Sequence, residues 1–239
     1  PLSNTLNEFD YVLDKLDAIK YTDIIDFHYR DHKSYIKLYD KYLRTNRVEG
    51  IWQTELGFSS KPQNLLSSYL RIMSWALSHN WTSSDTYKLF WYPAWASREQ
   101  KQYGLTTTLK NRTTVLTENG NELVLLNDLY ASGDLANQEV KSNMKSSLDS
   151  DDYYFGVKIS ERRVIIAVLI NSVNSYDKLN FSLVTKKEPR DVTLISSKGK
   201  QYQSHYSYEK GVTRIFIDKD NSPEDWDELM NVFFIRVNL

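Results

Sequence analysis

Glu55 is the residue of this sequence that is best placed to do chemistry. It stands near the end of Gly50-Ile-Trp-Gln-Thr-Glu-Leu-Gly57, a run typical of a strand that is closed by glycine. A carboxylate at the end of a parallel strand projects into the mouth of an α/β barrel, where such folds collect their catalytic groups. There it can act as a nucleophile or as a general acid or base. A glutamate at a strand end can also simply pair with a nearby Arg or Lys, and Glu55 alone leaves both interpretations open.

Two more predicted strands carry candidate residues, Thr22–Tyr29 and Tyr87–Tyr92. His28 alternates in phase with Asp26, so both side chains should share one face of the first strand. His28 is either a group that meets a substrate or a core histidine bonded to a backbone carbonyl. Trp91 in the other strand is either a stacking platform or ordinary core. Trp52 is out of phase with Glu55, so we expect it to face the surrounding helices as core.

Amphipathic helices separate these strands. Apolar residues at helical spacing predict helices over residues 4–19 and 34–44, and a third that Pro62 opens. Strands that alternate with helices indicate βαβ units and a parallel sheet. An eight-stranded barrel typically needs roughly 250 residues, so the sequence predicts only part of a (β/α)8 TIM barrel, over residues 1–148.

The second part of the chain, residues 149–239, is rich in short predicted strands. Together with turn signals such as Lys198-Gly-Lys, they predict an all-β domain, a β-sandwich. Before this second part, 122–130 is predicted as a short helix and 132–152 as a polar loop or a frayed helix. The predicted strands are Tyr154–Ile159, Val164–Ile170, Leu179–Val184, Val192–Ser196, Tyr202–Tyr208, Val212–Ile217 and Val232–Val237.

The composition narrows the classes of function. Thirty basic against thirty-one acidic residues give a net charge of -1, which does not favour a nucleic-acid partner. No apolar run is long enough to predict a membrane span. The absence of cysteine excludes disulfides and Cys-bound metals, and His28 with His32 does not form a recognisable metal motif. We expect no cofactor. Aromatic residues make up 13% of the chain, which is compatible with rings that stack on sugars.

The motif Trp52-Gln-Thr-Glu55-Leu-Gly57 resembles the seventh strand of retaining clan A glycosidases, where Trp-x-Thr-Glu-x-Gly carries the nucleophile. Asp23–Tyr29 is similar to their sixth strand, and Phe90–Tyr92 to their eighth. The resemblance covers about residues 4–104. It implies that Glu55 is the nucleophile, that His28 and Tyr29 contact the carbohydrate substrate or the nucleophile, and that Trp91 forms the floor of a sugar subsite.

The sequence departs from that family at the general acid/base, which these enzymes place in an Asn-Glu pair on the fourth strand. Asn7-Glu8 lies inside a predicted helix, and Asn121-Glu122 comes after the eighth strand. We therefore expect the acid/base to be missing from this chain, with the N-terminal half of the barrel as the part that would supply it.

Three hypotheses follow. The first is the C-terminal portion of a retaining glycoside hydrolase that cleaves oligo- or polysaccharides, extracellular or at the cell surface like most enzymes of that substrate class. The second is a non-catalytic module that binds carbohydrate or protein on a degenerate barrel fragment. The third is a doubly wound sheet unrelated to glycosidases.

Overall fold

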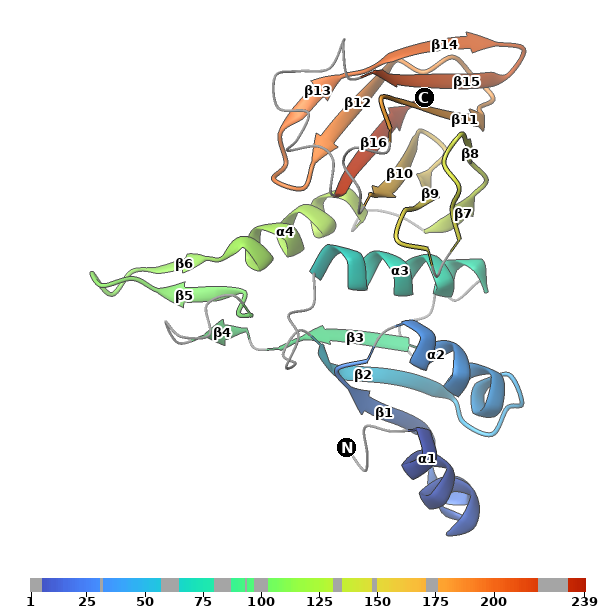
Figure 1. The fold of residues 1–239 in the computed structure, drawn as a ribbon, viewed down its shortest axis with the longest axis vertical. Coiled ribbons are helices and arrows are strands. Elements are labelled where there is room, and N and C mark those ends of the chain that lie inside the picture. The colour runs from blue at the N-terminus through green and yellow to red at the C-terminus, as the bar shows by residue number, and fades with distance from the viewer. Residues whose placement is uncertain are drawn as a thin grey trace. The chain divides into compact units, whose positions relative to one another are not determined.

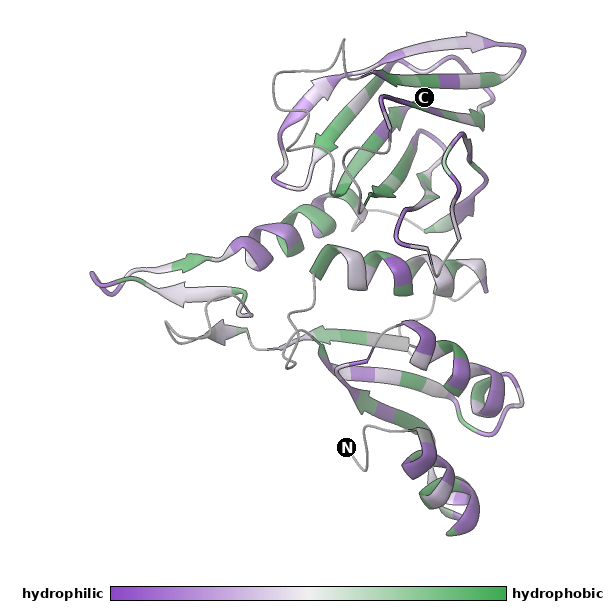
Figure 2. Ribbon diagram, viewed as in Figure 1, coloured by the Kyte–Doolittle hydropathy of each residue, from purple (hydrophilic) through white to green (hydrophobic). Residues whose placement is uncertain are grey.

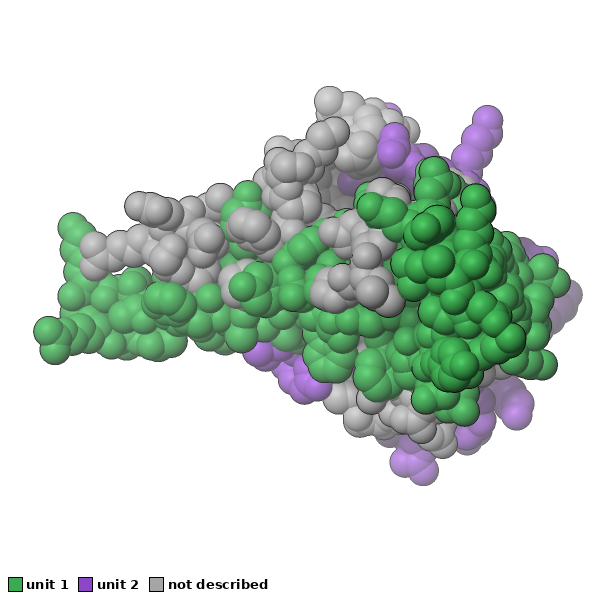
Figure 3. Space-filling view, turned by 90° about the horizontal axis from the view of Figure 1, so that it is seen from below, with its two compact units in different colours: residues 1–123 green, residues 124–239 purple. Residues whose placement is uncertain are grey.

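A computed structural model of the chain describes residues 6–30, 32–56, 65–79, 87–92, 94–96, 103–130, 135–147, 150–170, 176–218 and 232–239, which form a mixed helix and sheet structure (Figure 1). The chain divides into two compact units, Pro1–Leu123 and Val124–Leu239 (Figure 3). This division precedes the boundary predicted after residue 148, because two short strands before that position pair with strands of the second unit.

The first unit is built on a parallel sheet of three strands in the order β1-β2-β3, at the three places predicted from the sequence. The strands are β1 (Ile24–His28), β2 (Gly50–Leu56) and β3 (Tyr87–Trp91). The predicted intervening helices are also present, as α2 (His32–Leu38), which continues as a π-helical turn over Tyr39–Leu43, and α3 (Leu65–Ser78). Pro62 lies outside the described residues.

Both helices cover one face of this sheet. The ring of Phe27 in β1 meets Tyr35 of α2 edge-on at 4.8 Å between centroids, and Tyr35 lies 6.1 Å from Trp75 of α3. Ile25 and Ile51 are buried on the same side by strand alternation. The opposite face, which carries Asp26, is the one that these two helices leave uncovered, so reacting groups can lie there.

The predicted N-terminal helix is broken. It consists of α1 (Leu6–Phe9), a π-helical turn over Asp10–Lys15 and a 3₁₀ turn over Ala18–Tyr21. Asp17 adopts a left-handed φ of 59°, which an α-helix does not allow. The turn is held from outside, because Lys41 lies 2.6 Å from the Asp10 carboxylate and 2.7 Å from that of Asp14.

Three short strands and one helix follow. The strands are β4 (Trp95–Ala96), β5 (Thr106–Thr108) and β6 (Thr114–Leu116), and the helix is α4 (Glu118–Tyr130). The helix starts earlier than predicted because Thr117 caps it, its hydroxyl oxygen accepting a hydrogen bond from the N–H of Gly120 at 3.2 Å.

The second unit contains two antiparallel sheets. The six-stranded sheet has the order β13-β12-β16-β10-β9-β7 and the four-stranded sheet the order β14-β15-β11-β8. The first comprises β7 (Ala136–Gln138), β9 (Tyr153–Ser160), β10 (Arg163–Leu169), β12 (Asp191–Ser196), β13 (Gln201–Gln203) and β16 (Val232–Asn238). The second comprises β8 (Lys141–Ser142), β11 (Lys178–Val184), β14 (His205–Glu209) and β15 (Val212–Asp218).

Each strand predicted in this unit is present, with two differences. The segment predicted as one strand over Tyr202–Tyr208 is two strands, β13 and β14, which belong to different sheets. The predicted loop 132–152 contains the short strands β7 and β8. β7 passes so close to Gly156 of β9 that a Cβ there would lie 2.6 Å from the carbonyl oxygen of Gln138.

One hydrophobic core lies between these two sheets. It contains residues from both, including Val164, Phe181, Ile215 and Ile235. Hydrophobic residues are concentrated along β10, β12 and β16 (Figure 2). Because these strands also bury residues on their second face, where Phe234 lies 6.3 Å from Tyr130 of α4, they form near-continuous apolar runs.

Candidate functional site

A β-bulge shapes the end of β2. Phe27 of β1 pairs with Gln53, but the next residue, His28, pairs with Glu55, so Thr54 is an extra residue. The bulge brings the side chains of Thr54 and Glu55 to the same edge. It also corrects the prediction for Trp52, which pairs with Asp26 and therefore lies on the face opposite the helices, half-buried.

The Glu55 carboxylate is held by two residues from the end of β1. The phenol of Tyr29 donates a hydrogen bond to Oε2, and His28 Nδ1 lies 3.4 Å from the same oxygen. The Glu55 side chain is 34% exposed and that of His28 only 8%. Among the described residues, both contacts of this carboxylate are on Oε2. Within those residues the second oxygen, Oε1, accepts no hydrogen bond, which makes it the candidate atom for attack.

The other nitrogen of His28 joins a polar chain that runs back into the sheet. Nε2 lies 3.1 Å from the hydroxyl of Thr54, and that hydroxyl lies 2.9 Å and 3.0 Å from the two carboxylate oxygens of Asp26. The carboxylate can only accept while it is ionised, so the hydroxyl donates to Asp26 and its oxygen accepts from His28 Nε2–H. With that proton on Nε2, His28 Nδ1 donates to Glu55 only in an imidazole that carries both protons. Asp26, Thr54 and His28 therefore orient one another and fix the imidazole beside Glu55.

Backbone contacts hold Tyr29 in place. Its φ of 55° is left-handed, which is costly for an aromatic residue, and its N–H donates to the Glu55 carbonyl at 2.8 Å. The buried side chain of Gln53 bonds both backbone groups of Arg30, at 2.6 Å to the N–H and 3.1 Å to the carbonyl. Burial, and then the Glu55 carboxylate, raise the pKa of Tyr29. The phenol therefore stays protonated and remains a donor.

Trp91 is placed differently. Only 8% of it is exposed, its ring lies 6.3 Å from Tyr69 of α3, and its indole N–H donates to the Tyr103 carbonyl at 2.7 Å. These contacts favour the core interpretation of Trp91, and none of them joins it to Glu55. The structure thus brings Glu55, His28 and Tyr29 together and leaves Trp91 packed on a helix.

Three further residues complete the site: Asp26, Thr54 and Tyr92. Tyr92 is 47% exposed, and its N–H donates to the Leu56 carbonyl at 2.7 Å. It lies close enough to Tyr29 to contribute to the raised pKa of that phenol. Phase with His28 pointed to Asp26, whereas the bulge that recruits Thr54 leaves no signal in one sequence.

In the part of the chain that the structure describes, no group of three His, Asp or Glu side chains could hold a metal ion. Nor is any described helix both long and apolar enough to cross a membrane.

No protein-family model matches the chain, and no curated protein matches its sequence. Among solved structures, it is similar to the catalytic domain of GH30 xylanase C from Talaromyces cellulolyticus, with a TM-score of 0.46 and 12% identity over 95% of this chain and 48% of that one. It is also similar to the endo-β1,6-glucanase BT3312, with a TM-score of 0.44 and 8% identity over 98% and 45%. A third is SrfJ from Salmonella typhimurium, with a TM-score of 0.43 and 10% identity over 97% and 44%.

The chain spans about half the length of these solved structures. At such identities and TM-scores the likeness assigns no activity to this chain.

Proposed function

We propose that this chain is the C-terminal portion of a retaining glycoside hydrolase, in which β1, β2 and β3 are consecutive strands of a (β/α)8 barrel and the second unit is a β-sandwich. The observation that carries the proposal is the Glu55 carboxylate at the C-terminal edge of a parallel sheet, with one oxygen accepting from the Tyr29 phenol and lying beside the His28 ring. Barrel enzymes place their reacting groups at this edge.

In the proposed reaction Glu55 Oε1 attacks the anomeric carbon while the bond from that carbon to the leaving oxygen breaks. The leaving oxygen takes a proton from a general acid, and a glycosyl ester of Glu55 forms. Water, deprotonated by the same group, then hydrolyses the ester and restores the carboxylate. Tyr29 and His28 position Oε2. The hydrogen bond from Tyr29 weakens when the carboxylate loses its charge in the ester and strengthens when hydrolysis restores that charge.

The general acid/base is assigned to the remainder of the barrel, outside this chain. In retaining enzymes it lies about 5–5.5 Å from the nucleophile, so strands that supply it would join the sheet beside β1 or close the barrel around it. The proposed substrate is an oligo- or polysaccharide, which also favours a place outside the cell or at its surface. Trp91 was predicted as the sugar platform, and the more exposed Tyr92 is the alternative ring at the same edge.

The nucleophile is tested in the longest natural chain that contains these residues, with Glu55→Gln against Glu49→Gln. Glu49 is an exposed glutamate just before β2. We expect turnover of an aryl glycoside to fall on the order of 10³-fold or more for Glu55→Gln, the scale seen when a covalent nucleophile is lost. Glu49→Gln should keep the wild-type rate. Near-wild-type turnover in Glu55→Gln would refute the assignment.

A covalent label separates this proposal from the non-catalytic module. A dinitrophenyl 2-deoxy-2-fluoro-glycoside needs no protonation of its leaving group, so it can react even where the acid is absent. We expect peptide mapping by mass spectrometry to place the adduct on Glu55 and to find none in Glu55→Gln. Oligosaccharide binding without any adduct, across gluco-, xylo- and galacto-configured probes, would instead support the module.

A further inference from the structure

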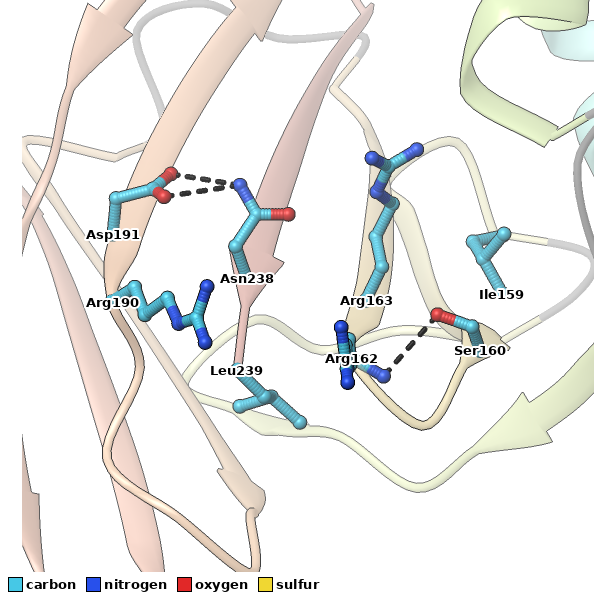
Figure 4. Close-up of a pocket in the computed structure, with 8 residues that line it drawn as sticks. All are labelled: Ile159, Ser160, Arg162, Arg163, Arg190, Asp191, Asn238 and Leu239. Atoms are coloured by element: carbon cyan, nitrogen blue, oxygen red, sulfur yellow. Dashed lines mark hydrogen bonds between the residues drawn. The ribbon is translucent and has the colours of Figure 1, made fainter.

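The second unit contains a pocket that the proposed hydrolysis does not use. It has a volume of about 430 Å³ and lies where β9 and β16 end and β10 and β12 begin. Three arginines contribute to its lining, along with a serine, an aspartate, an asparagine and two apolar residues (Figure 4). The lining residues are Ile159, Ser160, Arg162, Arg163, Arg190, Asp191, Asn238 and Leu239.

The backbone ladder fixes the positions of these arginines. Arg163 and Asp191 both pair with Asn238, so the three residues form one row across β10, β16 and β12. Arg190 donates its backbone N–H to the Asn238 carbonyl at 2.7 Å, and the Arg162 carbonyl accepts from the N–H of Leu239 at 2.8 Å. Arg162 and Arg190 thus flank the last residues of β16 on opposite sides, as Figure 4 shows.

The nearby carboxylates are already engaged. Asp191 accepts from the Asn238 side-chain amide at 3.0 Å and 3.1 Å and from the Thr193 hydroxyl at 3.1 Å. Glu161, in the turn before Arg162, pairs with Lys158, and its pKa is lowered by that contact and by the charge of Lys186. Within the described residues no carboxylate pairs with the guanidinium group of Arg162, Arg163 or Arg190.

Since the described residues offer these guanidinium groups no carboxylate partner, an anion from outside can pair with them. The lining side chains carry three positive charges and one negative, 3 − 1 = +2, and the main-chain carboxylate at Leu239, the last residue of this sequence, lowers the sum to 3 − 2 = +1. Arginine binds carboxylate, sulfate and phosphate groups through two parallel hydrogen bonds. The volume also falls in the range of roughly 300–1,000 Å³ that small-molecule sites occupy, which is larger than a bare anion needs.

We propose that this pocket binds an anionic carbohydrate, a sugar that carries a carboxylate or sulfate group. The guanidinium groups of Arg162, Arg163 and Arg190 take the anion, and the Asn238 amide oxygen and the Ser160 hydroxyl face the sugar hydroxyls. The preference for an anion rests on the pocket itself. The choice of a sugar as the molecule that carries the anionic group rests on the proposed function. The second unit would then recognise acidic groups along a polysaccharide.

The test measures binding by isothermal titration calorimetry to the longest natural chain, so it does not depend on turnover. The probes are tetragalacturonate, a sulfated tetrasaccharide, neutral cellotetraose, and inorganic sulfate and phosphate. We expect the two charged oligosaccharides to bind at least tenfold more tightly than cellotetraose and than either inorganic anion, with an affinity that falls as NaCl is raised.

The double variant Arg162→Gln, Arg190→Gln removes two charges from exposed side chains without breaking a described contact, so it should fold. It should lose at least tenfold in affinity for the charged probes. The matched surface variant Arg214→Gln, which removes only a contact with Glu209, should bind like the wild type. Equal binding of neutral and charged probes, or an unchanged affinity of the double variant, would overturn the site. Sulfate or phosphate that binds as tightly as the charged sugars would overturn the sugar assignment. Neither result would bear on the assignment of Glu55 as the nucleophile, because the covalent adduct on Glu55 is measured in a separate experiment.

Discussion

At Glu55 the two carboxylate oxygens have different surroundings. Oε2 faces the phenol of Tyr29 and the imidazole of His28, and Oε1 faces neither. A hydrogen bond to the ionised form of a carboxylate favours that form. Tyr29 therefore both orients the side chain and donates to the carboxylate that the second step of the reaction restores.

Replacing Tyr29 by Phe removes this donor and leaves the ring. A hydrogen bond to a charged group contributes about 1.5–3 kcal/mol, which corresponds to a factor of roughly 10 to 150 in a rate. We expect kcat/KM of Tyr29→Phe to fall by about tenfold or more, because Oε2 loses the donor that positions it. Tyr21→Phe, which alters a phenol that is 88% exposed and lies outside the site, is the control and should keep the wild-type kcat/KM. An unchanged kcat/KM in Tyr29→Phe would show that the phenol does not position Glu55.

At the scale of the element, Gln53 decides whether β1 and β2 end in the right register. Its side chain is fully buried and bonds the N–H and the carbonyl of Arg30, one residue after Tyr29. This pair of bonds supports the left-handed backbone of Tyr29, since the chain must turn there to bring the phenol to Glu55.

Gln53→Ala should therefore destabilise the first unit by about 2–4 kcal/mol, because two backbone groups lose their partners and a cavity remains. Urea unfolding followed by tryptophan fluorescence measures this, since Trp52, Trp75, Trp91 and Trp95 all lie in that unit. Gln203→Ala, at an exposed position of β13, should change the free energy of unfolding by less than about 0.5 kcal/mol. A similarly small effect at Gln53 would mean that the Arg30 backbone is satisfied by other groups.

The strands could be predicted from the sequence, whereas their irregularities could not. Apolar runs with β-branched residues predicted β1, β2, β3 and the strands of the second unit, because burial on one or both faces leaves a periodic signal. The bulge at Thr54 leaves none, since it depends on the backbone pairing with β1, and it misled the prediction for Trp52. β5 and β6 are short, and their threonines are half-buried in β5 and exposed in β6, so neither strand leaves an apolar pattern. The arginines of the pocket meet only through antiparallel register, across strands far apart in the chain.

For the molecule as a whole, pH dependence is expected from a buried acid in α4. Burial, and then the charge of Glu118, raise the pKa of Glu122 to about 7, while the backbone N–H of Leu66 opposes the shift. The folded state thus holds a proton that the unfolded state, with an ordinary value of 4.5, releases earlier. The folded protein gains from this proton below about pH 4.5 and loses the gain as pH rises through 7.

We expect the free energy of unfolding to fall by on the order of 2–3 kcal/mol between pH 5 and pH 8 through this group. Glu122→Gln, which stays neutral, should remove that part of the dependence, whereas Glu49→Gln should retain it. Urea titrations of the three proteins at both pH values provide the comparison. If the slope with pH were the same in Glu122→Gln as in the wild type, Glu122 would not be the group that titrates.

The crossing of the chain from β13 to β14 has a mechanical consequence. Ser204 is the only residue between a strand of the six-stranded sheet and a strand of the four-stranded sheet, and its N–H is tied to the Val192 carbonyl at 2.9 Å. Because a single residue joins the two hydrogen-bonded strands, a force applied to one sheet is transmitted directly to the other. When the second unit is pulled from its ends, both sheets should yield in a single rupture event rather than peel away one after the other.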